Sequence, residues 1–93
     1  ESAIMGCPGV ADVAVIGVPD DRWGEAVKAL IVAAPGERPD PADVIAWVRA
    51  RIAAYKVPKS IEFIEALPRN PSGKVLRREL RAPYWEGRDR AVG

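Results

Sequence analysis

The sequence predicts an α+β fold, a small three-stranded and mostly antiparallel sheet with helices packed on it. Two runs of small and β-branched apolar residues are separated by a short polar loop. A segment with helical spacing of its apolar residues comes next, and a third short apolar run follows it. With 93 residues, of which 48% are hydrophobic and 29% charged, the chain is long enough for one domain with a core.

The first half of the chain gives the hairpin of this fold. Residues 3–5, followed by Gly6 and Pro8, are typical of the last turn of a helix. Residues 10–18 and 27–33 are the two apolar runs. Because the loop that joins them is short, we expect the two strands to be antiparallel neighbours.

The second half gives the helices and the third strand. Asp40 and Pro41 are typical of an N-cap and the first helical position, so we expect a helix over residues 41–54. Its apolar residues recur on one face, which should cover the sheet. A strand over 61–64 and a short basic helix over 75–81 follow. The apolar face of the long helix consists of Val44, Ile45, Val48 and Ile52.

The domain prediction concerns both ends of the chain. Since the sequence opens without Met and inside a helix end, we expect residues 1–82 to form one domain of a larger chain. Two alternatives stay open for the tail 83–93, which either docks on a missing domain or is disordered.

Composition excludes several kinds of site. The chain has one cysteine, Cys7, and no histidine, which excludes a disulfide, a Cys/His zinc site and a Ser-His-Asp triad within it. The net charge is +1, but residues 1–68 carry seven Lys/Arg against ten Asp/Glu and residues 69–93 carry seven against three. No apolar run is long enough to span a membrane, so we expect a cytoplasmic protein.

One segment, residues 68–81, has the composition of a presented reactive group. Two prolines and a glycine stiffen the loop that leads to Lys74, with Ser72 and Gly73 immediately before it. An ammonium on such a loop is suited to bridging negatively charged oxygens in a transition state. The alternative is a solvated surface lysine at the start of a basic helix.

Nearly the whole chain resembles the C-terminal domain of the adenylate-forming enzymes, the superfamily of acyl-CoA synthetases. The similar stretches are GVADVAVIGVPDDRWGEAVKALIV and AAYKVPKSIEFIEALPRNPSGKVLRREL. The resemblance implies a C-terminal lid domain in which Lys74 contacts the acid carboxylate and the α-phosphate during acyl-adenylate formation. It also implies an absent N-terminal AMP-binding domain that holds ATP, Mg²⁺ and the acid, so the isolated fragment should be inactive and hold no cofactor.

The same resemblance implies a second face for CoA. The matching aromatic and basic positions are Trp23, Tyr55 and Lys59, where a ring can stack on adenine and an ammonium can bind phosphate. Val57 departs from relatives that have a basic residue there, which puts this CoA site in doubt. The alternative for Trp23 and Tyr55 is ordinary packing of a loop and a helix end.

The leading hypothesis is therefore the lid domain of an ATP-dependent acyl-CoA ligase acting on a fatty or other carboxylic acid, with no nucleic-acid partner. Two alternatives stay open. One is an adenylating enzyme that loads a carrier protein. The other is a free-standing module whose basic segment, with Tyr84 and Trp85 nearby, binds RNA or an acidic partner.

Overall fold

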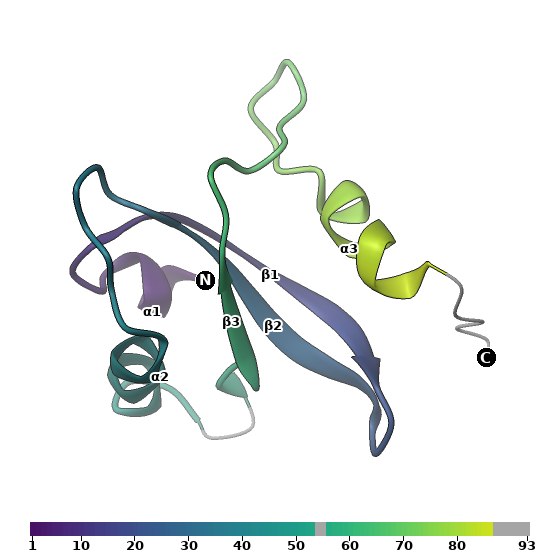
Figure 1. The fold of residues 1–93 in the computed structure, drawn as a ribbon, viewed down its shortest axis with the longest axis horizontal. Coiled ribbons are helices and arrows are strands. Elements are labelled where there is room, and N and C mark those ends of the chain that lie inside the picture. Colours follow the sequence, from purple (N-terminus) through teal and green to yellow (C-terminus); the bar gives the residue numbers. More distant parts are fainter. Residues whose placement is uncertain (54–55, 87–93) are drawn as a thin grey trace.

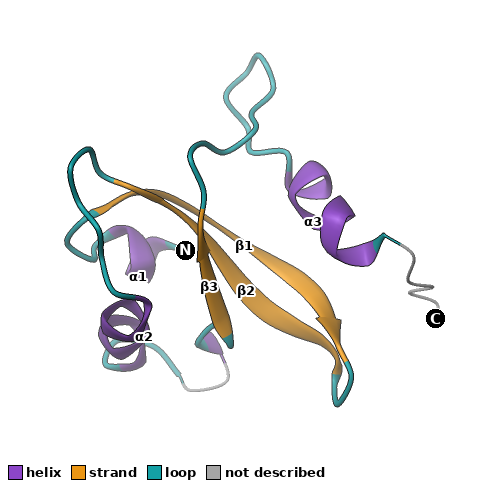
Figure 2. Ribbon diagram, viewed as in Figure 1, coloured by secondary structure: helices purple, strands orange, loops and turns teal. Residues whose placement is uncertain are grey.

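A three-stranded sheet with helices on both faces forms the domain (Figure 1). The computed structural model describes residues 1–53 and 56–86, and the strands lie in the order β1-β2-β3 (Figure 2). This architecture confirms the predicted α+β class. The elements are α1 (Ser2–Met5), β1 (Val10–Asp20), β2 (Gly24–Ala33), α2 (Pro41–Arg49), β3 (Ser60–Phe63) and α3 (Arg77–Trp85).

Strands β1 and β2 form the expected antiparallel hairpin, with a turn shorter than the sequence suggests. The two strands pair from Val10↔Ala33 to Asp20↔Gly24, which leaves only residues 21–23 in the turn. The Asp20 carboxylate accepts the Trp23 N–H at 2.9 Å and closes this turn. Polar residues that look like a loop in the sequence are thus the ends of the two strands.

Strand β3 pairs with β2 in parallel, so the expectation of a mostly antiparallel sheet is only half right. The pairing runs from Lys28↔Ser60 to Ile31↔Phe63. Helix α2 lies between the two strands in sequence, and a helical crossover returns the chain to the same end of the sheet from which β2 started. The sheet is therefore mixed, with one antiparallel and one parallel pairing.

Helix α2 begins as predicted and ends earlier than predicted. Asp40 is its N-cap and accepts the Ala42 N–H at 2.8 Å, with Pro41 in the first helical position. The helix ends at Arg49, because the N–H groups of Arg51 and Ile52 both donate to the Val48 carbonyl and tighten the last turn.

The sheet separates two groups of apolar side chains. The face toward α1 and α2 carries the larger group, in which Val44 and Val48 of α2 are fully buried. The opposite face is covered by α3 and the segment before it. The larger group is Ile4, Cys7, Val13, Ala29, Ile31, Val44, Val48 and Val57, and the smaller is Ala14, Ile16, Leu30 and Leu67.

Helix α3 begins two residues later and ends four residues later than the predicted span 75–81. It reaches Trp85 in spite of Pro83, because its last turn is attached to the sheet. The Tyr84 hydroxyl donates to Glu62, and Trp85 Nε1 donates to the Gly17 carbonyl at 2.9 Å. Burial and the hydrogen bond to Glu62 raise the pKa of Tyr84 to about 12. Residues 83–86 of the predicted tail thus lie in or beside α3, and 87–93 are outside the described residues.

None of the helices that the structure describes is long and apolar enough to cross a membrane.

Candidate functional site

Residues 69–75, here called the lysine loop, project from the end of the sheet where β3 finishes (Figure 1). An antiparallel bridge between Arg69 and Val75 closes the loop. Inside it, the Asn70 N–H donates to the Lys74 carbonyl at 2.9 Å and the Gly73 N–H donates to the Asn70 carbonyl at 2.8 Å. The loop therefore has a defined backbone shape, which the proline and glycine content predicted only in general terms.

The side chain of Asn70 fixes the inside of this loop. Its Oδ1 accepts the Ser72 N–H at 3.0 Å, the Ser72 hydroxyl at 2.7 Å and the Lys74 N–H at 2.9 Å. Three donors converging on one oxygen hold Ser72 and Lys74 around Asn70. Ser72 is thereby fixed against Asn70 inside the loop, and Gly73 has a φ of +91° that glycine adopts without strain.

Lys74 is exposed, and its ammonium makes no hydrogen bond or ion pair with any residue that the structure describes. It lies beside a hollow of about 580 Å³ between the lysine loop and the start of α3. Val75 and Leu76 separate Lys74 from α3, because Val75 is still paired in the loop. Arg77 and Arg78 also line the hollow, with Glu79 as its one carboxylate, so it favours anions.

The arginines of α3 differ in their partners. Arg77 is ion-paired with Glu1, and Arg81 lies 3.6 Å from a Glu25 carboxylate oxygen. Arg78 has no such partner among the described residues. Of the three, Arg78 is the cation most available to an approaching anion.

Two of the residues expected to contact CoA, Trp23 and Lys59, lie away from the end of the sheet that carries the lysine loop. Trp23 sits in the β1–β2 turn and is 67% exposed, which is inconsistent with a packing role. Lys59 is exposed just before β3, and its N–H donates to the Val27 carbonyl at 2.8 Å. Val27 lies four positions after Trp23, so Lys59 and Trp23 are roughly 13 Å apart along the strand. Tyr55 lies outside the described residues.

Figure 1 shows this separation, with the lysine loop at the top of the view and the β1–β2 turn at the lower right. The structure therefore does not bring Lys74 together with Trp23 and Lys59. Val57, the position that departs from the family pattern, is 8% exposed and belongs to the core. Its apolar side chain is explained by packing.

Comparison with known proteins identifies the domain. A family profile described as AMP-binding enzyme C-terminal domain matches residues 1–74, a span that covers the whole sheet and ends on Lys74. The chain belongs to this family. The family favours an adenylating enzyme over the alternative of a free-standing module that binds RNA or an acidic partner.

Individual relatives agree with the family. The fatty acid–[acyl-carrier-protein] ligase ScoC of Streptomyces coeruleorubidus is 50% identical over 92 residues, covering 99% of this chain and 18% of that protein. A feruloyl-CoA synthase of Amycolatopsis sp is 54% identical over 84 residues, covering 90% of this chain and 17% of that protein. The structure of a Mycobacterium tuberculosis fatty acyl CoA synthetase superposes with a TM-score of 0.83 at 45% identity, covering 96% of this chain and 18% of that one. This AMP-binding enzyme C-terminal domain thus spans less than a fifth of each.

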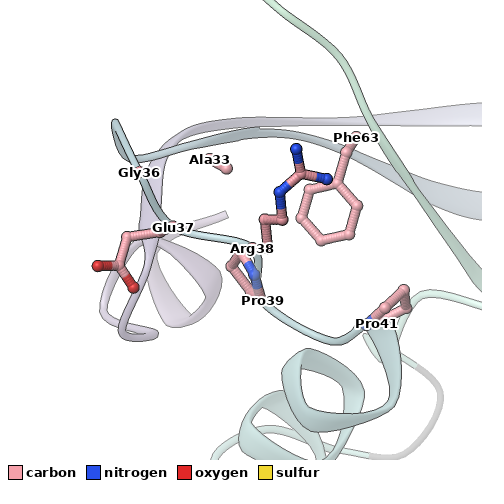
Figure 3. Close-up of a pocket in the computed structure, with 7 residues that line it drawn as sticks. All are labelled: Ala33, Gly36, Glu37, Arg38, Pro39, Pro41 and Phe63. Carbon is pink, nitrogen blue, oxygen red and sulfur yellow. The ribbon is translucent and has the colours of Figure 1, made fainter.

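A second hollow of about 530 Å³ lies between the β2–α2 connection and β3 (Figure 3). Figure 3 shows the Arg38 side chain beside the Phe63 ring, while the Glu37 carboxylate points away from both. None of the predicted site residues lines it. Nothing in its chemistry connects it with the lysine loop.

Sequence reasoning missed two residues that hold the lysine loop, Asp12 and Arg69. Arg69 donates from Nη1 to the Gly73 carbonyl and from Nη2 to Asp12 Oδ2, both at 2.6 Å. Arg69 adjoins the quoted motif, but Asp12 lies 57 positions away in the chain. The two residues meet only in the folded domain, where the Asp12 carboxylate on β1 accepts the Arg69 guanidinium.

Proposed function

We propose that this chain is the lid domain of an ATP-dependent ligase that joins a carboxylic acid to CoA, and that Lys74 assists the first half-reaction. The observation that carries the proposal is the unpaired, exposed ammonium of Lys74 on an internally hydrogen-bonded loop, beside a cationic hollow. A solvated lysine needs no such loop. The family assignment supplies the context of an AMP-binding enzyme.

The first half-reaction brings two anions together. A carboxylate oxygen attacks the α-phosphorus of ATP, the bond to the bridging oxygen breaks, and pyrophosphate leaves with that bond's electron pair. The ammonium of Lys74, inserted between the carboxylate and the α-phosphate oxygens, lowers their repulsion and stabilises the charge that moves to the phosphorus oxygens. The exposed loop is suited to entering a cleft in another domain.

In the second half-reaction the CoA thiol attacks the acyl carbonyl and AMP leaves. We assign Trp23 and Lys59 to this step as contacts for the CoA nucleotide, with Tyr55 as a third candidate. The location of Trp23 and Lys59, away from the end of the sheet that carries Lys74, supports a rotation of the domain between the two steps. A rotation of this kind exchanges one end of the sheet for the other at the active site.

We assign ATP, the acid and Mg²⁺ to the upstream domain. Among the described residues, no three His, Cys, Asp or Glu side chains lie close enough together to hold a metal ion. We also propose a cytoplasmic location, based on the lack of an apolar segment in the sequence long enough for a span.

The test uses the full-length enzyme that contains this domain, with Lys74→Ala and a matched Arg49→Ala control. Arg49 is an exposed cation at the end of α2, remote from the lysine loop in sequence and on another element. We expect Lys74→Ala to slow acyl-adenylate formation by about 10²–10³-fold. The rate of this step is measured by pyrophosphate exchange. Thioester formation from supplied acyl-adenylate should stay near wild type. Equal loss in both half-reactions would refute the assigned role.

A carrier protein is the second candidate acceptor, favoured by one observation. ScoC, whose name states that it ligates a fatty acid to an acyl carrier protein, is 50% identical over 99% of this chain. Loading assays of the full-length enzyme with CoA and with carrier protein separate the two. If acyl transfer to the carrier protein is faster than transfer to CoA, the carrier protein is the acceptor. The proposed role of Lys74 in the first half-reaction is unchanged by that result.

A further inference from the structure

We propose that Asp12 and Arg69 form a clamp that aims the lysine loop, which makes them positioning residues for adenylation. The inference rests on the proposed role of Lys74 and adds to it the part of the fold that orients the ammonium. Strand β1, which is distant from the loop in sequence, has an irregularity near its start.

A β-bulge at the start of β1 directs Asp12 toward the lysine loop. The register shifts between Val10 and Asp12, so one extra residue is inserted there. Val10 and Val13 consequently face the core beneath α1 and α2, although three positions separate them. In a regular strand Val10 and Asp12 share a face. With the bulge, Asp12 follows Ala14 onto the opposite face, the one beneath α3 and the loop.

The Asp12 carboxylate is fixed by a hydrogen bond within β1 in addition to its contact with Arg69. Its Oδ1 accepts the N–H of Val13 at 2.9 Å, and its Oδ2 accepts Arg69 Nη2 at 2.6 Å. Arg69 uses its other terminal nitrogen for the Gly73 carbonyl at 2.6 Å, the peptide that leads into Lys74. The Arg69 guanidinium thus joins Asp12 on β1 to Gly73, the residue before Lys74, through two short hydrogen bonds whose donor is charged.

The remaining bonds of the loop fix its shape but not its direction. The contacts of Asn70 are all made within residues 70–74. Among the described residues, no other hydrogen bond or ion pair of positions 69–74 reaches the sheet. The base of the loop is also anchored by packing, because Val75 packs against the core group that contains Leu67. Without the clamp, the outer part of the loop can still shift relative to the sheet and carry Lys74 with it.

The ion pair between Arg69 and Asp12 should affect the rate of adenylation more than it affects the stability of the domain. The side chains of Arg69 and Asp12 are 42% and 31% exposed. Pairs this exposed contribute little to unfolding stability. A displacement of the ammonium of about 1 Å, in contrast, can lower a rate by up to about 100-fold. Loss of the clamp should therefore reduce the rate of one step without a matching loss of folded protein.

The experiment compares Arg69→Ala, Asp12→Ala and the double variant in the full-length enzyme, with Arg49→Ala as the matched arginine control. We expect each single clamp variant to slow adenylation about 10- to 100-fold, with the thermal midpoint and thioester formation from supplied acyl-adenylate near wild type. The double variant should be no slower than the slower single variant, because both substitutions remove the same link. Arg69→Lys, which retains charge but lacks the fork, should lie between wild type and Arg69→Ala.

Three results would overturn the clamp: wild-type adenylation by Arg69→Ala, multiplied effects in the double variant, or equal loss in both half-reactions. If an alanine variant fails to fold, Asp12→Asn and Arg69→Lys decide the matter by the same readouts. Lys74→Ala, measured in parallel, distinguishes the two proposals. Its failure to slow adenylation refutes the proposed function, whereas its success with unaffected clamp variants refutes the clamp alone.

Discussion

Gly73 holds the lysine loop in a backbone conformation that alanine adopts only with strain. Its φ is +91°, and an added Cβ would meet no atom within 4 Å, so the penalty comes from the backbone and not from packing. A side chain at such a φ costs about 1–2 kcal/mol. The chain can relieve this strain by rotating the peptide between Gly73 and Lys74, whose carbonyl accepts from Arg69. Relief of strain therefore displaces Lys74.

Gly36 provides a matched control for Gly73→Ala. Its φ is +78°, an added Cβ there also meets open space, and it lies in the β2–α2 connection. Both alanine substitutions should lower the free energy of unfolding by a similar amount, about 1–2 kcal/mol. Only Gly73→Ala should also slow pyrophosphate exchange, about tenfold, in the full-length enzyme. Equal exchange rates in the two variants would show that the shape of the loop does not control the position of Lys74.

Three further predictions concern other parts of the domain. Trp23→Ala should raise the KM for CoA and leave pyrophosphate exchange unchanged, and an unchanged KM would remove Trp23 from the CoA site. Tyr84 keeps its proton in the folded state to about pH 12, while the unfolded chain loses it near pH 10, so stability should fall as pH rises between these values. Urea titrations should show a shallower fall for Tyr84→Phe, and an identical slope would contradict the raised pKa. Val48→Ala removes fully buried methyl groups and should lower the free energy of unfolding by about 2 kcal/mol in the same titrations. A loss below about 0.5 kcal/mol, which is the scale of surface substitutions, would contradict the burial of Val48.

Local chemistry accounts for the elements that the sequence predicts well. The N-cap of Asp40 and the first-turn Pro41 fix the start of α2 with side-chain and backbone geometry that lies within three residues. The lysine loop is similar, because Asn70, Ser72 and Gly73 are turn formers that bond to one another. In both cases the interacting groups are neighbours in the chain.

The remaining features depend on contacts between distant residues. The parallel pairing of β3 requires the crossover through α2, a signal that the order strand, helix, strand already contains. The extension of α3 to Trp85 depends on the hydrogen bonds of Tyr84 and Trp85 to the sheet, which override the propensity of Pro83 to end a helix. The link between Asp12 and Arg69 needs the bulge in β1, and a strand pattern alone does not specify that shift.

Chemical rescue of Lys74 is the sharpest test of its proposed role in adenylation. Lys74→Cys in the full-length enzyme removes the ammonium. Aminoethylation of the new thiol restores an ammonium group on a side chain with the same number of atoms as that of lysine. The native thiol of this domain, Cys7, is 6% exposed and burial raises its pKa, so it reacts poorly, and aminoethylated wild-type enzyme controls for other thiols. We predict that pyrophosphate exchange collapses in Lys74→Cys and returns on aminoethylation. Exchange at the wild-type rate before aminoethylation would show that the ammonium of Lys74 does not assist adenylation.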